Sequence, residues 1–288
     1  MRYIVRRLVD HQDLRWVFFW ILGLTVVAVW DVLFLNRPAL QRLTAASVNT
    51  ALVGCCVVVF AFLLGWISAL ALHFFDHAQR RWIYLPTVFV LNLIRSVPQI
   101  VGVLLGYVVL TMWIRAEALR QESSQLVALA AIISIFVFLE VTDLMRERIR
   151  HFRRLDFFDA MLCSGIRESR IVNIEILWKN SRAHLLHKAV QMFAAAVFLL
   201  CSVDFIVSVG LSTDVSLSNF PPTLGGLLAT MDSKQDILAV SAVLSDPARA
   251  PSLLFEHLQG VSTAFVIVFT LLCMHRIGAA FVARRKLE

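Results

Sequence analysis

Acidic side chains occur inside or beside long apolar stretches of this sequence. Asp204 lies deep in one apolar run, and Glu140 and Asp143 lie near the end of another. Ionisable groups within a membrane usually face a wet cavity or a partner charge, because exposure to lipid is costly. We therefore expect Asp204 and Glu140 to line a solute pathway, where a carboxylate could meet a cationic group. The alternative for Asp204 is a hydrogen bond between subunits or between helices.

Other polar groups in this part of the sequence have simpler interpretations. Glu140 could pair with Arg95 at the membrane boundary. His184 and His187 are three residues apart, a spacing that can bind a metal on one helix face, but no carboxylate or cysteine is in register with them. The five cysteines show no C-x-x-C spacing and fall mostly within apolar runs. We expect neither a metal site nor a disulfide.

The elements that must position these groups are membrane helices. The chain has 288 residues, of which 59% are hydrophobic and 16% charged, and its mean hydropathy is +0.77. It therefore carries more apolar side chains than one soluble core could bury. A helical crossing needs about 20 apolar residues. Six stretches qualify or nearly do, at residues 16–35, 48–72, 97–114, 126–144, 185–209 and 261–282. The sequence therefore predicts an all-α polytopic membrane protein with about six transmembrane helices.

The distribution of basic residues predicts the orientation. The net charge of +7 does not indicate nucleic-acid binding, because the basic residues lie between the apolar runs. With six crossings, the N-terminus and the segment after the fourth apolar run lie on the same side of the membrane, and most basic residues fall on that side. The positive-inside rule therefore places both termini in the cytoplasm. Residues 1–15 are expected to form an interfacial amphipathic lead, followed by an uncleaved first helix.

Prolines and polar residues suggest where several helices begin. Pro86 and Pro98 divide an apolar segment, because proline is tolerated in the first turn of a helix and poorly inside it. We expect an interfacial helix over residues 82–95 and the start of the third crossing near Pro98. A loop containing Pro38 should precede the second crossing, which would start near Asn49, with Ser47 or Thr50 as cap.

Two loops are long enough to have structure of their own. The segment at about 211–259 contains paired prolines and glycines and is expected to form an ordered extracytoplasmic cap. The cytoplasmic loop at about 145–184 carries helical patterns. An amphipathic helix over 155–163 should end at Gly165. A second helix, over 168–178, should return toward the membrane with an apolar stripe of Ile171, Ile174, Ile176 and Leu177.

Two short helices joined by a turn of small residues form a compact protrusion that can dock into another protein. Ala160, Ser164 and Gly165 would supply that turn and allow close backbone approach. The alternative is an interfacial hairpin with no partner.

The same loop resembles a motif of known importers. Binding-protein-dependent ABC importer permeases carry a cytoplasmic E-A-A-x-x-x-G sequence followed by I-x-L-P, which docks into the ATPase subunit. Here Asp159-Ala160-Met161 stands at the E-A-A position, and Gly165 and Leu177 fall in register. The flanking residues, including Ile171 and Ile176, are similar to the C-type subunit of dipeptide, oligopeptide and nickel permeases.

This resemblance implies a function and a set of partners. The chain would be the permease subunit of an ABC importer in the bacterial plasma membrane, with residues 16–285 as its permease domain and half of the pathway for a peptide-like or other small solute. It would work with a second, different permease, two ATP-binding subunits and an extracytoplasmic substrate-binding protein. The implied coupling residues are Asp159, Ala160, Gly165, Ile171, Ile176 and Leu177.

The sequence also limits what the chain does by itself. It has no G-x-x-x-x-G-K-[ST] phosphate loop, so ATP and Mg²⁺ would bind to the partner ATPase subunits, with no cofactor and no enzymatic site on this chain. The segment from Arg95 to Gln99 is similar to permeases for amino acids or phosphonate, so an amino acid, a metal or a phosphonate-type solute is the alternative cargo. Outside this class, an ATP-independent carrier or a membrane-embedded enzyme stays open.

Overall fold

The computed structural model describes residues 12–77, 81–210, 220–230, 241–249, 251 and 258–285. These residues form helices and loops, with no β-strand among them. Five helices are long and apolar enough to cross a membrane, and a sixth crossing is present if one bent helix pair counts as a span. The all-α fold of a multi-pass membrane protein is therefore confirmed.

The helices are joined by short connections as far as residue 182. In chain order they are α2 (Gln12–Phe34), α3 (Arg37–His77), α4 (Arg81–Ser96), α5 (Gln99–Arg115), α6 (Glu122–Arg153), α7 (Asp156–Cys163), α8 (Glu168–Arg170), the π-helix η1 (Ile171–Asn180), α9 (Arg182–Gly210), α10 (Leu224–Thr230), the 3₁₀ turn η3 (Pro247–Arg249) and α13 (Leu258–Arg285).

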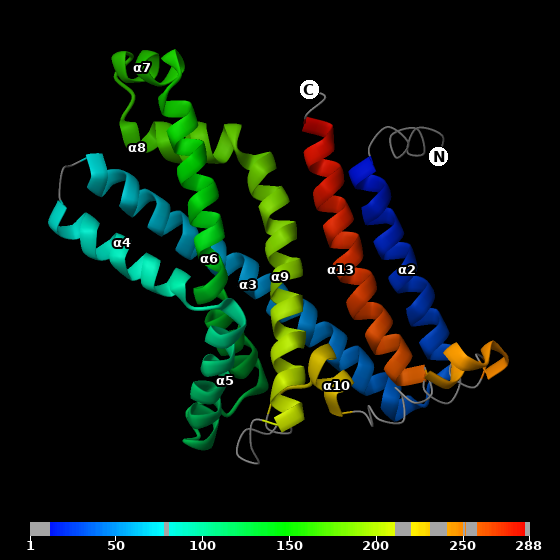
Figure 1. The fold of residues 1–288 in the computed structure, drawn as a ribbon. Helices are drawn as coiled ribbons and strands as arrows, with labels where there is room; N and C mark the ends of the chain where they lie inside the picture. Colours follow the sequence, from blue (N-terminus) through cyan, green and yellow to red (C-terminus); the bar gives the residue numbers. More distant parts are fainter. Residues whose placement is uncertain are drawn as a thin grey trace.

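The first residue of α2 and the last of α13 lie at the same end of the bundle as α7 (Figure 1). An even number of crossings agrees with this placement.

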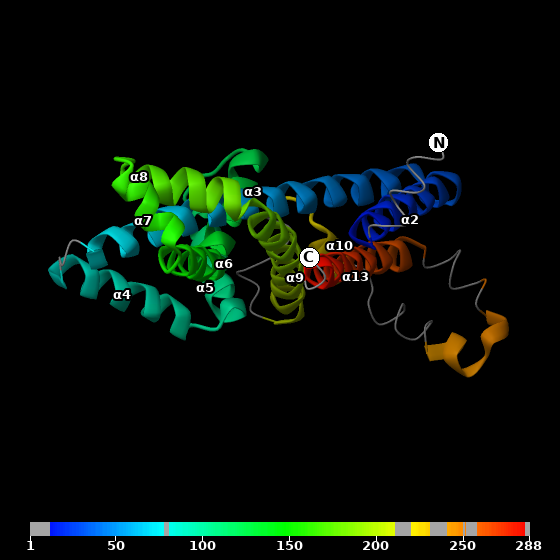
Figure 2. The ribbon, with the colours of Figure 1, turned by 90° about the horizontal axis from the view of Figure 1, so that it is seen from above.

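Helix α6 is central to the bundle. It packs along α3 and against α5 and α9, and more than half of its apolar window is buried. Helix α2 is peripheral, because it packs mainly against α13 and almost all of its apolar window faces outward. Figure 2 shows α2 and α13 as neighbours beside α9. The main core therefore lies among α3, α5, α6 and α9, with η1 at one end.

The elbow between α4 and α5 forms at the expected place. Helix α4 ends at Ser96, α5 begins at Gln99, and the two axes differ by 93°. Proline forces the residue before it out of the helical region, so the chain turns at Val97 and Pro98. A break at Pro98 is confirmed. Helix α4 leaves the line of α5 and lies against α3 and α6 (Figure 1).

Helix α3 begins earlier than the sequence suggested. It starts at Arg37 and has 41 residues, with Pro38 in its first turn, where proline is well tolerated. A start near Asn49 with a cap from Ser47 or Thr50 is wrong. The Ser47 hydroxyl instead donates to the Leu43 carbonyl one turn back, at 2.8 Å. A helix of this length spans about 60 Å, twice the bilayer core, and it crosses its neighbours obliquely (Figure 1).

The segment at residues 220–230 packs into the bundle, where α10 contacts α9, α3 and α13. Asn49 and Thr50 of α3 hold this segment. The Asn49 amide donates to the Pro222 carbonyl at 2.9 Å, and the Leu224 N–H donates to the Thr50 hydroxyl at 2.8 Å. Much of the expected cap at 211–259 and residues 1–11 of the expected lead lie outside the described residues, so both stay predictions.

Candidate functional site: the α7–η1 hairpin and the polar groove between α6 and α9

Helix α7 ends in a full Schellman motif. The N–H of Gly165 donates to the Leu162 carbonyl at 2.9 Å, and the N–H of Ile166 donates to the Met161 carbonyl at 3.2 Å. Gly165 has a φ of +75°, a conformation that glycine adopts without steric cost. A Cβ at this position would meet no atom within 4 Å. The glycine is thus required by backbone conformation, and the corner around it is open.

The returning segment is a π-helix, with a different buried face from the one expected. Ile171, Val172, Ile176 and Leu177 are fully buried, whereas Ile174 is 42% exposed. The buried residues form two pairs five positions apart, which would lie about 140° apart around an α-helix. The wider π-helix brings residues of this spacing onto one face. The expectation of an apolar stripe including Ile174 is wrong for this reason.

Polar contacts fix the hairpin to the bundle. Glu168 lies 3.1 Å from Nε2 of His73 on α3 and 3.9 Å from the guanidinium of Arg153 on α6. The indole N–H of Trp66 donates to the Asn173 side chain at 2.8 Å. The Arg148 Nε donates to the hydroxyl of the buried Ser181 at 3.2 Å, after the end of η1. The hairpin is therefore braced at both ends of its returning helix.

Helix α7 exposes a mixed apolar and acidic surface. Asp159, Ala160 and Gly165 are exposed. Leu155, Phe157 and Leu162 each expose about 40% of their surface. Phe158 is the buried anchor, and the Arg153 guanidinium lies 5.7 Å from the centre of its ring. We call the exposed residues 155, 157, 159, 160, 162 and 165 the α7 knob. It lies at the end of the bundle, beyond α6 (Figure 1).

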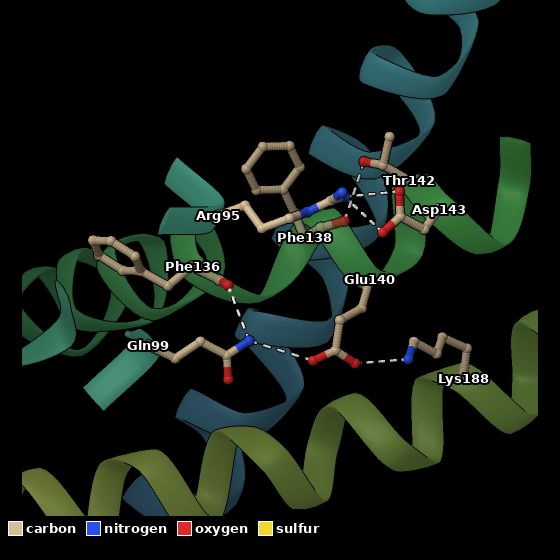
Figure 3. Close-up of polar contacts among 8 residues, drawn as sticks. All are labelled: Arg95, Gln99, Phe136, Phe138, Glu140, Thr142, Asp143 and Lys188. Carbon is tan, nitrogen blue, oxygen red and sulfur yellow. Dashed lines mark hydrogen bonds and ion pairs between the residues drawn. The ribbon is translucent and has the colours of Figure 1, made fainter. Parts of the chain in front are cut away.

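The second part of the site is a network of charges between the elbow, α6 and α9 (Figure 3). The guanidinium of Arg95 donates to both carboxylate oxygens of Asp143, at 2.9 and 2.7 Å. Glu140 accepts from Lys188 at 2.7 Å and from the Gln99 amide at 3.3 Å. The expected pairing of Glu140 with Arg95 is wrong. Arg95 pairs with Asp143, which lies nearly one turn further along α6, and Glu140 points toward α9.

Three of these residues, Glu140, Asp143 and Lys188, line a polar groove of about 360 Å³ between α6 and α9. Its α6 wall includes Glu140, Asp143 and Glu147, which share one helix face at spacings of three and four. Its α9 wall includes His184 and Lys188. Among the described residues, no group of three histidine, cysteine, aspartate or glutamate side chains is arranged to hold a metal. The groove can present carboxylates to a polar or cationic group.

His187 also lines the groove but packs toward α13. Its ring stacks on Phe281 with 5.4 Å between ring centres and 3° between planes. Its Nε2 lies 3.0 Å from the Gln191 amide nitrogen, and its buried Nδ1 has no hydrogen-bond partner among the described residues. His184 and His187 therefore have different surroundings.

Asp204 lies apart from this groove, in the interior of the bundle, and is 1% exposed. Its Oδ1 accepts from the Tyr107 hydroxyl and its Oδ2 from the Thr223 hydroxyl, each at 2.6 Å. The backbone N–H of Gly226 donates in turn to the Thr223 hydroxyl at 3.1 Å. The hydrogen bond between helices that the sequence left open for Asp204 is present. The carboxylate joins α5, α9 and the segment that leads into α10.

A scan of family models and a search of curated proteins found no match to this chain. The functional interpretation consequently depends on the geometry of the hairpin, the groove and the Asp204 junction.

Several partners of the site were not anticipated from the sequence. Lys188 and Gln99 were missed as partners of Glu140, and Tyr107 and Thr223 as partners of Asp204. Asp31 is also buried, with 2% exposure, and accepts a hydrogen bond from Ser262 at 2.5 Å. A carboxylate within the membrane is costly, so its position in the sequence predicts that neighbouring helices supply hydrogen-bond donors to it. Which donors approach depends on helix rotation and tilt.

Proposed function

We propose that this chain is the permease subunit of an ATP-driven importer in the bacterial plasma membrane. It would form half of the translocation pathway for a peptide-like or other small solute. A second permease, two ATP-binding subunits and an extracytoplasmic substrate-binding protein would complete the transporter. ATP and Mg²⁺ would bind to the ATPase subunits.

The α7 knob is the observation that carries this proposal. Mechanical coupling needs a compact, exposed surface on a base that does not deform. The knob exposes Asp159 and Ala160 beside the glycine corner. Ile171, Ile176 and Leu177 form the buried face of the returning helix. In the proposal the exposed residues contact the ATPase, and the buried ones hold the hairpin in place. The contacts of Glu168 with α3 and α6 would pass force from the knob into the bundle.

The polar groove supplies a second supporting observation. It lies between α6, which ends two residues before the knob, and α9, which follows the returning helix. A movement of the hairpin would therefore change the spacing of its two walls. In this proposal Glu140 lines the solute pathway at this end, and Asp204 holds α5, α9 and the segment before α10 together.

Copurification tests the proposal directly. The full chain, tagged and purified in mild detergent from its own host, should bring down proteins that carry a phosphate loop, together with ATP hydrolysis. Asp159→Lys reverses a charge on the knob and should lower the recovered ATPase by at least about tenfold. A docking surface complementary to Asp159 would then face a lysine of its own charge, which is strongly unfavourable. Mass spectrometry and phosphate release give the two measurements.

Glu122→Lys is the matched control for this charge reversal. Glu122 is also exposed and in the first turn of a helix, but it lies at the opposite end of α6. Circular dichroism should show unchanged helix content for both variants. The proposal fails if no ATPase accompanies the unaltered chain, or if both variants recover equal amounts of it.

A further inference from the structure

A large apolar groove lies on the outer face of the bundle, between α3, the end of η1 and α9. Its volume is about 610 Å³, within the range of small-molecule sites. Val58, Phe62 and Leu185 are its partly or fully buried walls, and Val59, Leu63 and Leu186 form an exposed rim. All six are on helices that can cross a membrane. The groove is thus open to the hydrocarbon layer.

One end of the groove is chemically different from the rest. Trp66, Trp178 and Arg182 line it there. A hydrogen bond from the Trp66 indole to the Asn173 side chain of η1 holds Trp66 at this end. Trp178 and Arg182 lie on either side of the junction between η1 and α9. The aliphatic residues extend along α3 back to Val58 and along α9 on to Ala189, about 10–12 Å from this end. The groove is amphipathic along its length.

Arg182 is available to a ligand. Its side chain is exposed, and no hydrogen bond or ion pair joins it to another described residue. The neighbouring Lys179 differs, because its Nζ lies 2.8 Å from Glu175. Trp178 exposes 67% of its surface. Tryptophan is enriched where a protein meets the lipid headgroups, and an arginine at the end of a membrane helix extends toward the same layer.

We propose that this groove binds one anionic phospholipid. An acyl chain lies between α3 and α9 against Phe62 and Leu185, and the phosphate pairs with the Arg182 guanidinium, whose fork of donors matches phosphate oxygens. Trp178 covers the glycerol region. Charge complementarity favours this occupant over a second copy of the chain, because among the described residues the groove offers an unpaired cation at one end and apolar surface beyond it. The site is independent of the transport proposal.

A lipid titration of the delipidated full chain tests the site. Native mass spectrometry in mild detergent counts bound phosphatidylglycerol and phosphatidylcholine. Phosphatidylglycerol should bind more tightly, and Arg182→Gln should weaken it about five-fold, the effect of one cation near a lipid surface. Phosphatidylcholine binding should respond less. Ala189→Trp should fill the aliphatic end and remove the bound lipid.

Two matched controls keep the result specific. Arg150→Gln removes another exposed arginine that does not line the groove, and Ala45→Trp adds the same bulk at an exposed alanine elsewhere on α3. Both should leave lipid binding unchanged. Soluble glycerol phosphate should neither bind nor compete, which separates a lipid from a free phosphate.

Three outcomes would overturn the site. The first is equal loss of phosphatidylglycerol in Arg150→Gln and Arg182→Gln, which indicates general surface attraction. The second is unchanged lipid binding in a folded Ala189→Trp variant. The third is a dimer that Ala189→Trp dissociates while the lipid count stays constant, since a second copy would then occupy the groove.

Discussion

The hydroxyl of Tyr107 on α5 lies 2.6 Å from Oδ1 of Asp204 on α9, and both residues are almost fully buried. Thr223 donates to the other carboxylate oxygen. One acidic side chain thereby holds together two long helices and the segment before α10. A charge that could have faced the solute is, in this structure, the centre of a helix junction.

Removing the Tyr107 hydroxyl should weaken this junction. Tyr107→Phe keeps the ring but leaves a buried carboxylate oxygen without its donor, which costs about 1–3 kcal/mol. The thermal unfolding midpoint in detergent should fall. Thr111→Val is the control, because the Thr111 hydroxyl is also buried on α5 but donates to the Tyr107 backbone carbonyl within the same helix. An equal fall in both variants would contradict a special role for the junction.

Close approach of α10 to α9 makes a second prediction. A Cβ on Gly225 would lie 2.5 Å from the Cys201 Cα and 2.7 Å from Oδ2 of Asp204, so it would collide with backbone. Gly225→Ala should therefore displace α10 and destabilise the fold by about 1–3 kcal/mol or more. At Gly226 the nearest atom, the Thr223 hydroxyl oxygen, would be 3.1 Å away, so Gly226→Ala should be milder. Limited proteolysis near residue 220 measures the displacement.

The sequence predicts the elements of this fold better than their contacts. Six apolar runs and Pro98 were sufficient to place the long helices and the elbow, because length, hydrophobicity and proline geometry act locally. The start of α3 was misplaced because Ser47 and Thr50 are good capping residues that here lie inside a helix. Their actual partners, such as the Leu224 N–H, are far away in sequence.

The site shows the same division between local and distant information. Gly165 was identified from the helix pattern before it, and its positive φ confirms a helix end there. Ile174 was assigned to the wrong face because the pattern was interpreted with an α-helical period. The pairing of Arg95 with Asp143, and not with Glu140, depends on the rotation of α6 relative to the elbow, which no local pattern encodes.

The π-helical register of η1 gives a third prediction. Ile176→Ala removes a fully buried side chain and should destabilise the protein by about 2–5 kcal/mol. Ile174→Ala changes a residue that is 42% exposed and should stay within about 0.5 kcal/mol of the unaltered chain. Thermal unfolding of the two variants in parallel compares them. Similar losses would indicate that the segment is an α-helix with Ile174 on its apolar face.

The two ion pairs beside the groove should differ in strength. The side chains of Arg95 and Asp143 are each 53% exposed, so a double-mutant cycle with Arg95→Gln and Asp143→Asn should give less than about 1 kcal/mol. Lys188 is only 17% exposed in its pair with Glu140, so the cycle with Lys188→Gln and Glu140→Gln should give a larger coupling, about 1–3 kcal/mol. Thermal unfolding of all variants supplies the cycles. The reverse order would show that burial does not set these energies.

The corner at Gly165 allows the effect of backbone conformation to be separated from the effect of bulk. Its φ of +75° makes alanine unfavourable by about 1–2 kcal/mol, although there is room for the Cβ. Asparagine tolerates this region better and is larger than alanine. Hydrogen exchange of the Gly165 and Ile166 amides, which close the Schellman motif, should thus accelerate by roughly 5–30-fold in Gly165→Ala and less in Gly165→Asn. If the knob docks on an ATPase through this corner, ATPase recovery should fall more in Gly165→Asn than in Gly165→Ala, because the larger asparagine blocks close approach while keeping the turn. If recovery instead falls more in Gly165→Ala, the partner requires the backbone conformation of the corner and not its open surface.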